Sequence, residues 1–204
     1  MLKMEKEYIQ EYGDIPKDFQ GRINKLLEET NLSRYQITVY EEVKRIFAIN
    51  WKTFKYTIYL LPKATPRPRS GKNGIFYVKG ASDNKKFFQK NFVKQEDIPL
   101  ITTPTKFACR SYLPIPKSMH PVEKILAEMG FIYPVSKPDW DNLAKAYCDM
   151  IQGIILYDDS LVVDGISQKR YSIKPRIEVE ISYMEDYDSQ FNKKKILKKG
   201  GQNR

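Results

Sequence analysis

Histidine and cysteine are scarce in this chain of 204 residues, which contains one histidine, His120, and two cysteines, Cys109 and Cys148. A single histidine argues against a histidine-based metal site or catalytic triad, and we expect His120 only to precede a helix that begins at Pro121. The cysteines have apolar neighbours and form no Cys-x-x-Cys motif. Packed free thiols are therefore expected, in place of a disulfide or a zinc site.

Long apolar runs are missing as well. The chain starts Met-Leu-Lys-Met-Glu-Lys-Glu, which lacks the apolar core of a signal peptide. No uninterrupted apolar span is long enough to cross a membrane. These two absences predict a cytoplasmic protein without a membrane partner.

Positive charge, by contrast, is in excess. The chain has 35 Lys and Arg residues against 25 Asp and Glu residues, a net charge of +10 at pH 7. This balance indicates a polyanionic partner without saying which one. Residues 186–204 form a Lys-rich tail that we expect to be disordered and to add DNA affinity without sequence preference.

Acidic residues are grouped at one place in this basic chain. Asp139 and Asp141 would lie about 200° apart on a helix, so they can converge only if the chain between them is not helical. Pro138 favours an extended approach to Asp139, and Asp141 is a suitable N-cap for the helix that follows. The pattern therefore predicts a strand end, an acidic turn and then a helix.

Lys145 follows Asp141 by four residues and so lies on the same side of that helix. With a third carboxylate from Asp158 or Asp159, the turn would be an oxygen-rich site suited to Mg²⁺ or Mn²⁺. Such an ion polarises a phosphodiester and lowers the pKa of an attacking water, and Lys145 would stabilise the developing negative charge. The alternative is purely structural: a helix cap, a turn at Asp158-Asp159 and a solvated ion pair of Lys145.

The pattern Lys-Pro-Asp-x-Asp-Asn-x-x-Lys, followed by x-x-x-Asp, an Asp-Asp-Ser turn and a Val-rich strand, resembles the RusA family of Holliday-junction resolvases. The likeness extends over roughly residues 52 to 184. It implies a homodimeric, Mg²⁺-dependent endodeoxyribonuclease that acts in DNA recombination and repair. Such an enzyme resolves four-way DNA junctions by hydrolysing one phosphodiester in each of two opposed strands, leaving 5′-phosphate and 3′-hydroxyl ends.

The resemblance also implies which residues form the site. By position, the three metal-binding aspartates are Asp139, Asp141 and Asp159, and the assisting lysine is Lys145. Asp158 is a further candidate ligand, because the turn places both neighbours near the site. Two alternatives remain open at this point: a non-catalytic protein that binds branched DNA and retains the acidic motif, and a hydrolase of small phosphate esters.

Basic residues near the motif and in a Pro- and Gly-rich loop are the candidate DNA contacts. Arginine can hold a phosphate through two hydrogen bonds, and phosphate contacts position a protein without specifying sequence. A solvated loop is the alternative interpretation of residues 66–74. The candidate DNA-binding residues are Arg67, Arg69, Lys72, Lys137, Lys169 and Arg170.

The hydrophobic pattern predicts an α+β fold, with a mixed, largely antiparallel sheet flanked by helices. Strands are expected at 54–60 and 106–112, and an antiparallel pair at 161–171 and 176–183. A helix is expected at 121–129, with four apolar residues facing inward: Val122, Ile125, Leu126 and Met129.

Three segments are expected along the chain. Residues 1–50 form a helical extension that either binds DNA, mediates dimerisation or simply packs on the catalytic domain. Residues 51–185 form the RusA-like catalytic domain, and residues 186–204 the basic tail.

Overall fold

The computed structural model describes residues 18–29, 36–64, 69–71, 74–76 and 98–185. The chain is divided into two compact units, Met1–Asn50 and Trp51–Arg204. The first contains helices α1 (Phe19–Glu29) and α2 (Gln36–Phe47), in the segment where helices were expected. None of the described helices is long and apolar enough to span a membrane.

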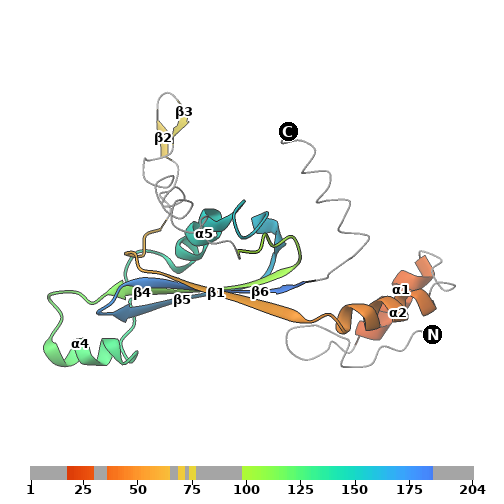
Figure 1. Ribbon diagram of the computed structural model, residues 1–204, viewed down its shortest axis with the longest axis horizontal. Coiled ribbons are helices and arrows are strands. Elements are labelled where there is room, and N and C mark those ends of the chain that lie inside the picture. The colour runs from red at the N-terminus through yellow and green to blue at the C-terminus, as the bar shows by residue number, and fades with distance from the viewer. Residues whose placement is uncertain (1–17, 30–35, 65–68, 72–73, 77–97, 186–204) are drawn as a thin grey trace. The chain divides into compact units, whose positions relative to one another are not determined.

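The second unit is built on a four-stranded sheet (Figure 1). Its strands are β1 (Trp51–Ile58), β4 (Thr105–Pro114), β5 (Val162–Ser172) and β6 (Arg176–Met184), in the spatial order β1-β6-β4-β5. β6 is antiparallel to both β1 and β4, whereas β4 and β5 are parallel. The expected mixed, largely antiparallel sheet is therefore confirmed, and β5 lies at its edge.

The expected hairpin between β5 and β6 was wrong, because β4 lies between them. Ser172 at the end of β5 pairs with Pro114, the last residue of β4, and Arg176 at the start of β6 pairs with Tyr112. Residues 173–175 thus carry the chain past the end of β4. Pro114 has no N–H to continue the backbone hydrogen bonds of the sheet, so β4 ends there. Residues 173–175 can therefore cross beyond the end of this strand.

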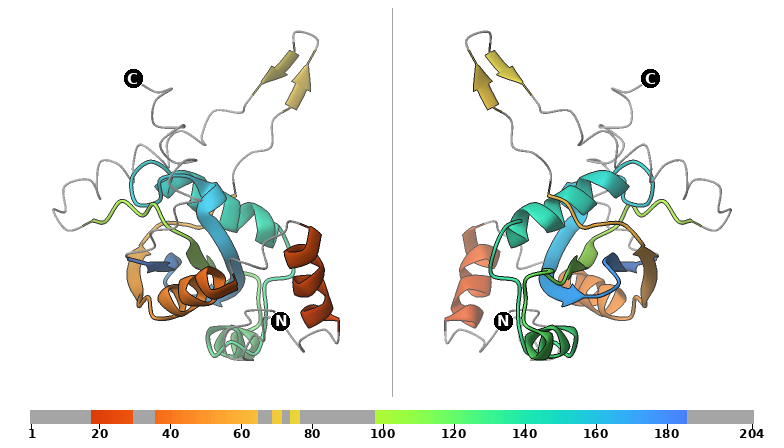
Figure 2. Two further views of the ribbon diagram at one scale, coloured as in Figure 1. Left: turned by 90° about the vertical axis from the view of Figure 1, so that its right-hand side faces the viewer. Right: turned by 90° about the vertical axis from the view of Figure 1, so that its left-hand side faces the viewer.

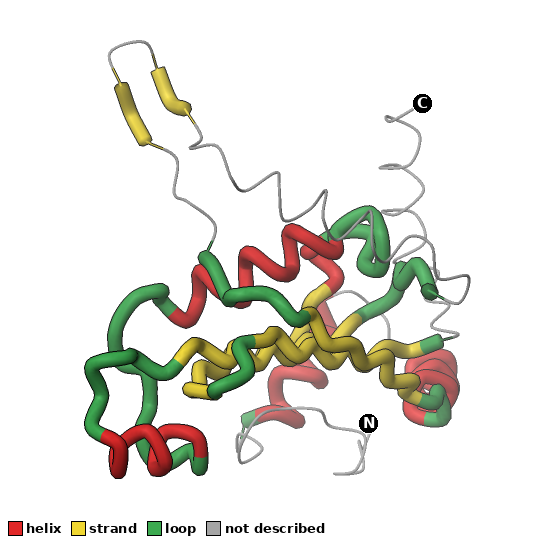
Figure 3. Tube along the Cα trace, turned by 60° about the vertical axis from the view of Figure 1, so that its left-hand side comes forward, coloured by secondary structure: helices red, strands yellow, loops and turns green. Residues whose placement is uncertain are grey.

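One face of the sheet is apolar. Helix α5 (Trp140–Ile151) covers this face, as Figure 3 shows. In β4 the alternate residues from Thr105 to Leu113 are buried, as the two-residue period of a strand predicts. On α5 the matching stripe is Leu143, Tyr147, Met150 and Ile151, all buried. The Tyr147 hydroxyl also accepts a hydrogen bond from the backbone N–H of Lys63 at 3.1 Å, which ties the helix to the segment after β1.

The opposite face of the sheet is polar. Glu180 on β6 pairs with Lys55 on β1 at 3.2 Å and with Arg110 on β4 at 3.5 Å. The hydrogen bond from Lys55 is the main cause of the lowered pKa of Glu180. On the same face the Lys106 ammonium lies 4.6 Å from the centre of the Trp51 ring. These exposed pairs add little stability individually. Because charged residues occupy this face, the apolar residues of the strands lie on the α5 side.

The helix α4 (Pro121–Glu128) begins as expected at His120. The His120 Nδ1 atom accepts a hydrogen bond from the Val122 N–H at 3.4 Å, and Glu123 accepts one from the His120 N–H at 3.1 Å. This reciprocal capping box satisfies N–H groups that a helix start otherwise leaves unpaired. Figures 1 and 2 show α4 on the other side of the sheet from α5.

The apolar stripe of α4 does not face inward, and that expectation was wrong. Val122, Ile125 and Met129 are 57%, 62% and 63% exposed. The helix is instead held by its other residues: Ala127 is fully buried, and the Glu128 carboxylate accepts hydrogen bonds from the Ile173 N–H at 2.6 Å and the Ser172 hydroxyl at 3.1 Å. Because Glu128 is anchored to the turn after β5, the apolar stripe is directed away from the sheet.

Both cysteines are free, as the sequence predicted, and Cys109 is buried beneath α5. Burial raises the pKa of the Cys109 thiol from 9.0 to about 12. The folded protein therefore keeps this thiol neutral and unreactive at physiological pH.

The raised pKa of Cys109 predicts a loss of stability in alkali. The unfolded chain releases this proton near pH 9.0, whereas the folded chain retains it to about pH 12. Above pH 9.0 the unfolded state thus binds fewer protons, and the free energy of unfolding falls by up to about 1.4 kcal/mol per pH unit through this group. Urea unfolding on both sides of pH 9.0 should give a shallower pH slope for Cys109→Ala than for wild type. Equal slopes would contradict the prediction.

Candidate active site

The acidic motif lies where a loop of residues 131–139 enters α5. Asp139 is the N-cap, with an extended backbone (φ −66°, ψ 146°), and Asp141 lies in the first helical turn. The expectation of Asp141 as N-cap, with a strand end before it, was therefore wrong. An aspartate in the first turn is also favoured by the helix dipole, so the helix can start before Asp141 instead of after it.

The edge strand β5 holds the start of α5 in place. The Lys169 ammonium donates hydrogen bonds to the carbonyl oxygens of Ser136 at 2.9 Å and Pro138 at 3.0 Å. The Ser167 hydroxyl donates to the carbonyl oxygen of Trp140 at 2.8 Å. The backbone is thus fixed immediately before and after Asp139.

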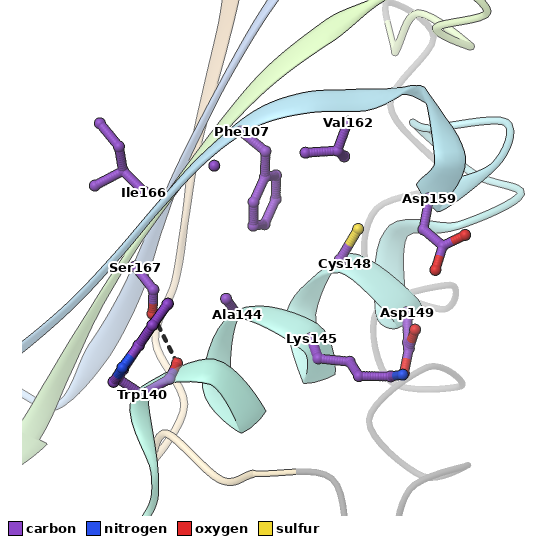
Figure 4. A pocket seen from close by; sticks show the side chains of 11 residues that line it. Phe107, Trp140, Ala144, Lys145, Cys148, Asp149, Asp159, Val162, Ile166 and Ser167 are labelled. Atoms are coloured by element: carbon purple, nitrogen blue, oxygen red, sulfur yellow. Dashed lines mark hydrogen bonds between the residues drawn. The ribbon is translucent and has the colours of Figure 1, made fainter. Parts of the chain in front are cut away.

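A pocket of about 270 Å³ lies between α5, β4 and β5. Figure 4 shows Lys145, Asp149 and Asp159 at one end of it and Trp140 with Ser167 at the other. Apolar side chains lie between these ends. The lining residues are Phe107, Trp140, Ala144, Lys145, Cys148, Asp149, Asp159, Val162, Gly165, Ile166 and Ser167.

The adjacent aspartates of the Asp-Asp-Ser turn have different environments. Asp158 caps the short 3₁₀-helix η3 (Asp159–Leu161): its Oδ1 atom accepts hydrogen bonds from the Ser160 N–H at 3.0 Å and from the Ser160 hydroxyl. Asp159 instead lines the pocket opposite α5. The carboxylate that the turn contributes to the pocket is therefore that of Asp159.

The Cys148 thiol lies within the influence of two aspartates at the charged end of the pocket. Its pKa is raised to about 12, chiefly by burial and then by the negative charges of Asp159 and Asp149. Two carboxylates that act on one thiol from different elements also act together on anything that enters the pocket. The two carboxylates would attract a cation, and the Lys145 ammonium lines the same end of the pocket.

Of the four predicted metal ligands, Asp159 alone lines the pocket. Within the described ranges no three Asp, Glu, His or Cys side chains form a group that could hold a metal ion. Asp139 and Asp141 do not line the pocket with Asp159, and Asp139 instead accepts a hydrogen bond from the Asn142 side chain at 3.4 Å. Mg²⁺ is commonly held by one or two carboxylates, with water and substrate phosphate as its other ligands. Asp149 and Asp159 are the two carboxylates that line the pocket, and their oxygens are of the donor type that Mg²⁺ takes.

The sequence comparisons connect this pocket with a known family. The family model for endodeoxyribonuclease RusA matches residues 60–182, which include the whole of α5, η3 and β5. The chain belongs to the RusA endodeoxyribonuclease family. A relative of this RusA-family chain, the "Uncharacterized protein YqaN" of Bacillus subtilis (strain 168), is 38% identical over 133 residues, which cover 62% of this chain and 94% of YqaN.

Asp149 and Trp140 are two of the lining residues of this RusA-family pocket that were not predicted as site residues. Asp149 lies four residues after Lys145 and eight after Asp141, so all three share one side of α5. That spacing is visible in the sequence and could have identified Asp149. Trp140, between the two aspartates of the motif, gave no such signal, because only the position of β5 shows that it borders a pocket.

The structure describes four of the six residues that were predicted to contact DNA. Arg67 and Lys72 lie outside the described residues, and Arg69 is the first residue of β2 (Arg69–Gly71), which pairs with β3 (Gly74–Phe76). Lys137 is exposed in the loop before Asp139. The Arg170 guanidinium lies 4.8 Å from the centre of the Tyr133 ring, and this contact partly covers it.

The hydrogen bonds of Lys169 predict that it positions the site more than it binds DNA. Lys169→Met should lower kcat for DNA cleavage by about 10²-fold, because the loop before Asp139 loses both of its ammonium contacts and the site shifts. The dissociation constant for DNA should change less than about twofold. If Lys169 instead contacts phosphate, the variant will bind DNA more weakly. The slope of log K against log salt will then become shallower by about 0.9, the value for one phosphate contact. Lys137→Met, in the same loop but exposed, is the matched control.

Proposed function

We propose that this protein is a Mg²⁺-dependent endonuclease that resolves four-way DNA junctions in recombination and repair. The observation that carries the proposal is the pocket of a RusA-family chain in which Lys145 and Asp149 on α5 lie with Asp159 on η3. The net charge of +10 supports a nucleic-acid substrate over a small phosphate ester. Mn²⁺ is the expected substitute for Mg²⁺.

The ion would be held by Asp159 and Asp149, with Asp139 and Asp141 as the other acidic positions of the family pattern. When bound, Mg²⁺ supplies polarisation of the scissile phosphodiester and an attacking water of lowered pKa. Lys145 stabilises negative charge on the phosphate or on the leaving oxygen.

Resolution requires two cuts in opposed strands, and the pocket between α5, β4 and β5 would make one of them. A two-fold homodimer would present two pockets related by the same symmetry as the junction. The exposed apolar stripe of α4 supports this assembly, because contiguous apolar surface of that kind marks a protein interface. The Lys- and Arg-rich parts of the chain would hold the four arms through phosphate contacts.

The deciding experiment is cleavage of an end-labelled synthetic four-way junction beside a linear duplex of the same sequence. Reactions with Mg²⁺ or with EDTA, and with wild type or Asp159→Asn, complete the set. Paired, symmetric nicks near the crossover that require Mg²⁺ and disappear in the variant would support the proposal. Binding without cleavage under every metal would favour a branched-DNA-binding protein. Faster hydrolysis of mononucleotides than of branched DNA would favour the small-ester hydrolase.

A further inference from the structure

Most of the pocket lining is apolar and has no group that could take part in phosphodiester hydrolysis. Phe107, Ala144 and Val162 lie between the charged end and Trp140 (Figure 4). A phosphate and a hydrated cation gain nothing from apolar walls, which cannot replace their hydrogen bonds to water. The walls suit a flat, weakly hydrated group that is attached to the phosphate.

Trp140 is positioned as a stacking surface for such a group. Its side chain is 61% exposed, although its backbone is fixed by the hydrogen bond from the Ser167 hydroxyl. An exposed indole on a rigid backbone costs little entropy when a base stacks on it. Trp51, the chain's other tryptophan, lies on the opposite face of the sheet beneath the Lys106 ammonium.

Gly165 on β5 keeps the pocket open. A Cβ atom built at this position would meet no other atom within 4 Å, and the backbone there does not require glycine. A glycine inside a strand commonly marks the close approach of a ligand. A larger side chain at residue 165 would therefore occupy the pocket without straining the fold.

The volume limits what can enter. At about 270 Å³ the pocket is just below the range of about 300–1,000 Å³ that is usual for drug-sized ligands. We propose that it binds a single unstacked nucleobase, from the nucleotide beside the scissile phosphate, with Trp140 stacked on its face. This inference rests on the proposed function, because the charged end must hold that phosphate.

The base pocket gives the protein a way to select branched DNA. A base can enter only after it leaves the helical stack, and this costs least where the duplex is already interrupted. Nucleotides at a crossover meet that condition, whereas those in a linear duplex do not. Trp140 and Gly165 thus determine selectivity, and the carboxylates and Lys145 perform the cleavage.

Occupancy of the pocket can be measured without cleavage. In full-length Trp51→Phe protein, Trp140 is the single tryptophan, and Ca²⁺ in place of Mg²⁺ keeps a cation at the carboxylates while hydrolysis is suppressed. We expect its fluorescence to be strongly quenched by a saturating four-way junction and little changed by a linear duplex, with binding followed separately by the anisotropy of labelled DNA. Unchanged emission at saturation by the junction would overturn the pocket but leave the proposed function standing. Absence of junction binding would overturn both.

A substrate change tests the same contact during cleavage. Trp140→Ala, Gly165→Val and an abasic nucleotide beside the scissile phosphate should each slow junction cleavage by about 10-fold or more, as expected for the loss of one base stack. The losses from Trp140→Ala and from the abasic nucleotide should not multiply, because both remove the same contact. Multiplicative losses would show that Trp140 acts elsewhere. Trp51→Ala is the matched control, with circular dichroism to verify folding.

Discussion

Asp159→Asn should lower the rate of junction cleavage by about 10²–10³-fold, whereas Asp158→Asn should leave it within about threefold. The two residues are adjacent and identical in chemistry, so the contrast depends only on where each carboxylate lies. Asp159 lines the pocket with Lys145 and Asp149. Asp158 instead caps η3 through Ser160.

Stability should be affected in the opposite way to activity: Asp158→Asn should be the less stable of the two variants. Asp158→Asn keeps an acceptor for the Ser160 N–H, so a loss of no more than about 1 kcal/mol is expected. Asp159→Asn removes one of the carboxylates near Cys148 and should leave the protein as stable as wild type or slightly more stable. Single-turnover cleavage measures the rate, and thermal unfolding measures the stability. Junction binding in EDTA verifies that both variants still bind DNA. Full activity of Asp159→Asn would remove the pocket from consideration as the catalytic site.

Much of the sheet could be predicted from the sequence because its strands carry their own signals. Phe54, Tyr56 and Ile58 alternate with polar residues, as do Ile177, Val179 and Ile181, and both segments are strands with those residues facing α5. The pairing of strands could not be predicted in the same way. Consecutive strands usually neighbour one another, but the insertion of β4 between β5 and β6 depends on contacts distant in the chain.

The site shows a similar division between local and distant information. The acidic motif and Lys145 are contiguous in the sequence, so their place on α5 could be predicted to within two residues. The difference between Asp158 and Asp159 could not, because it depends on the direction of each side chain in a tight turn. Lys169 was predicted to contact DNA from its charge, yet its partners are backbone carbonyls 31 and 33 residues earlier in the chain.

Helix α4 illustrates what periodicity leaves open. Its apolar stripe is plain in the sequence, and periodicity defines the stripe without naming what covers it. A second copy of the chain is the occupant that the proposed paired cleavage requires. The Glu128 hydrogen bonds hold α4 with the stripe outward, so the stripe cannot be buried by rotation of the helix.

Ile125→Lys should therefore convert the proposed dimer into a monomer. The substitution places a charge at the centre of the stripe, between Val122 and Met129. A central interface residue contributes about 2 kcal/mol or more, and in a two-fold interface each substitution acts twice. The dimer dissociation constant should rise by about 10³-fold, measured by sedimentation equilibrium, while Leu61→Lys, which alters an exposed leucine outside α4, should change it little.

The same variant separates single from paired cleavage. A monomer with an intact pocket still hydrolyses one phosphodiester, but the second cut then needs a new encounter. On a supercoiled plasmid with an extruded cruciform, wild type should give linear product directly, and Ile125→Lys should accumulate nicked circles first. Because lysine adds positive charge, weaker DNA attraction cannot explain the change. Linear product from a variant shown to be monomeric would mean that the two cuts are not coupled by dimerisation.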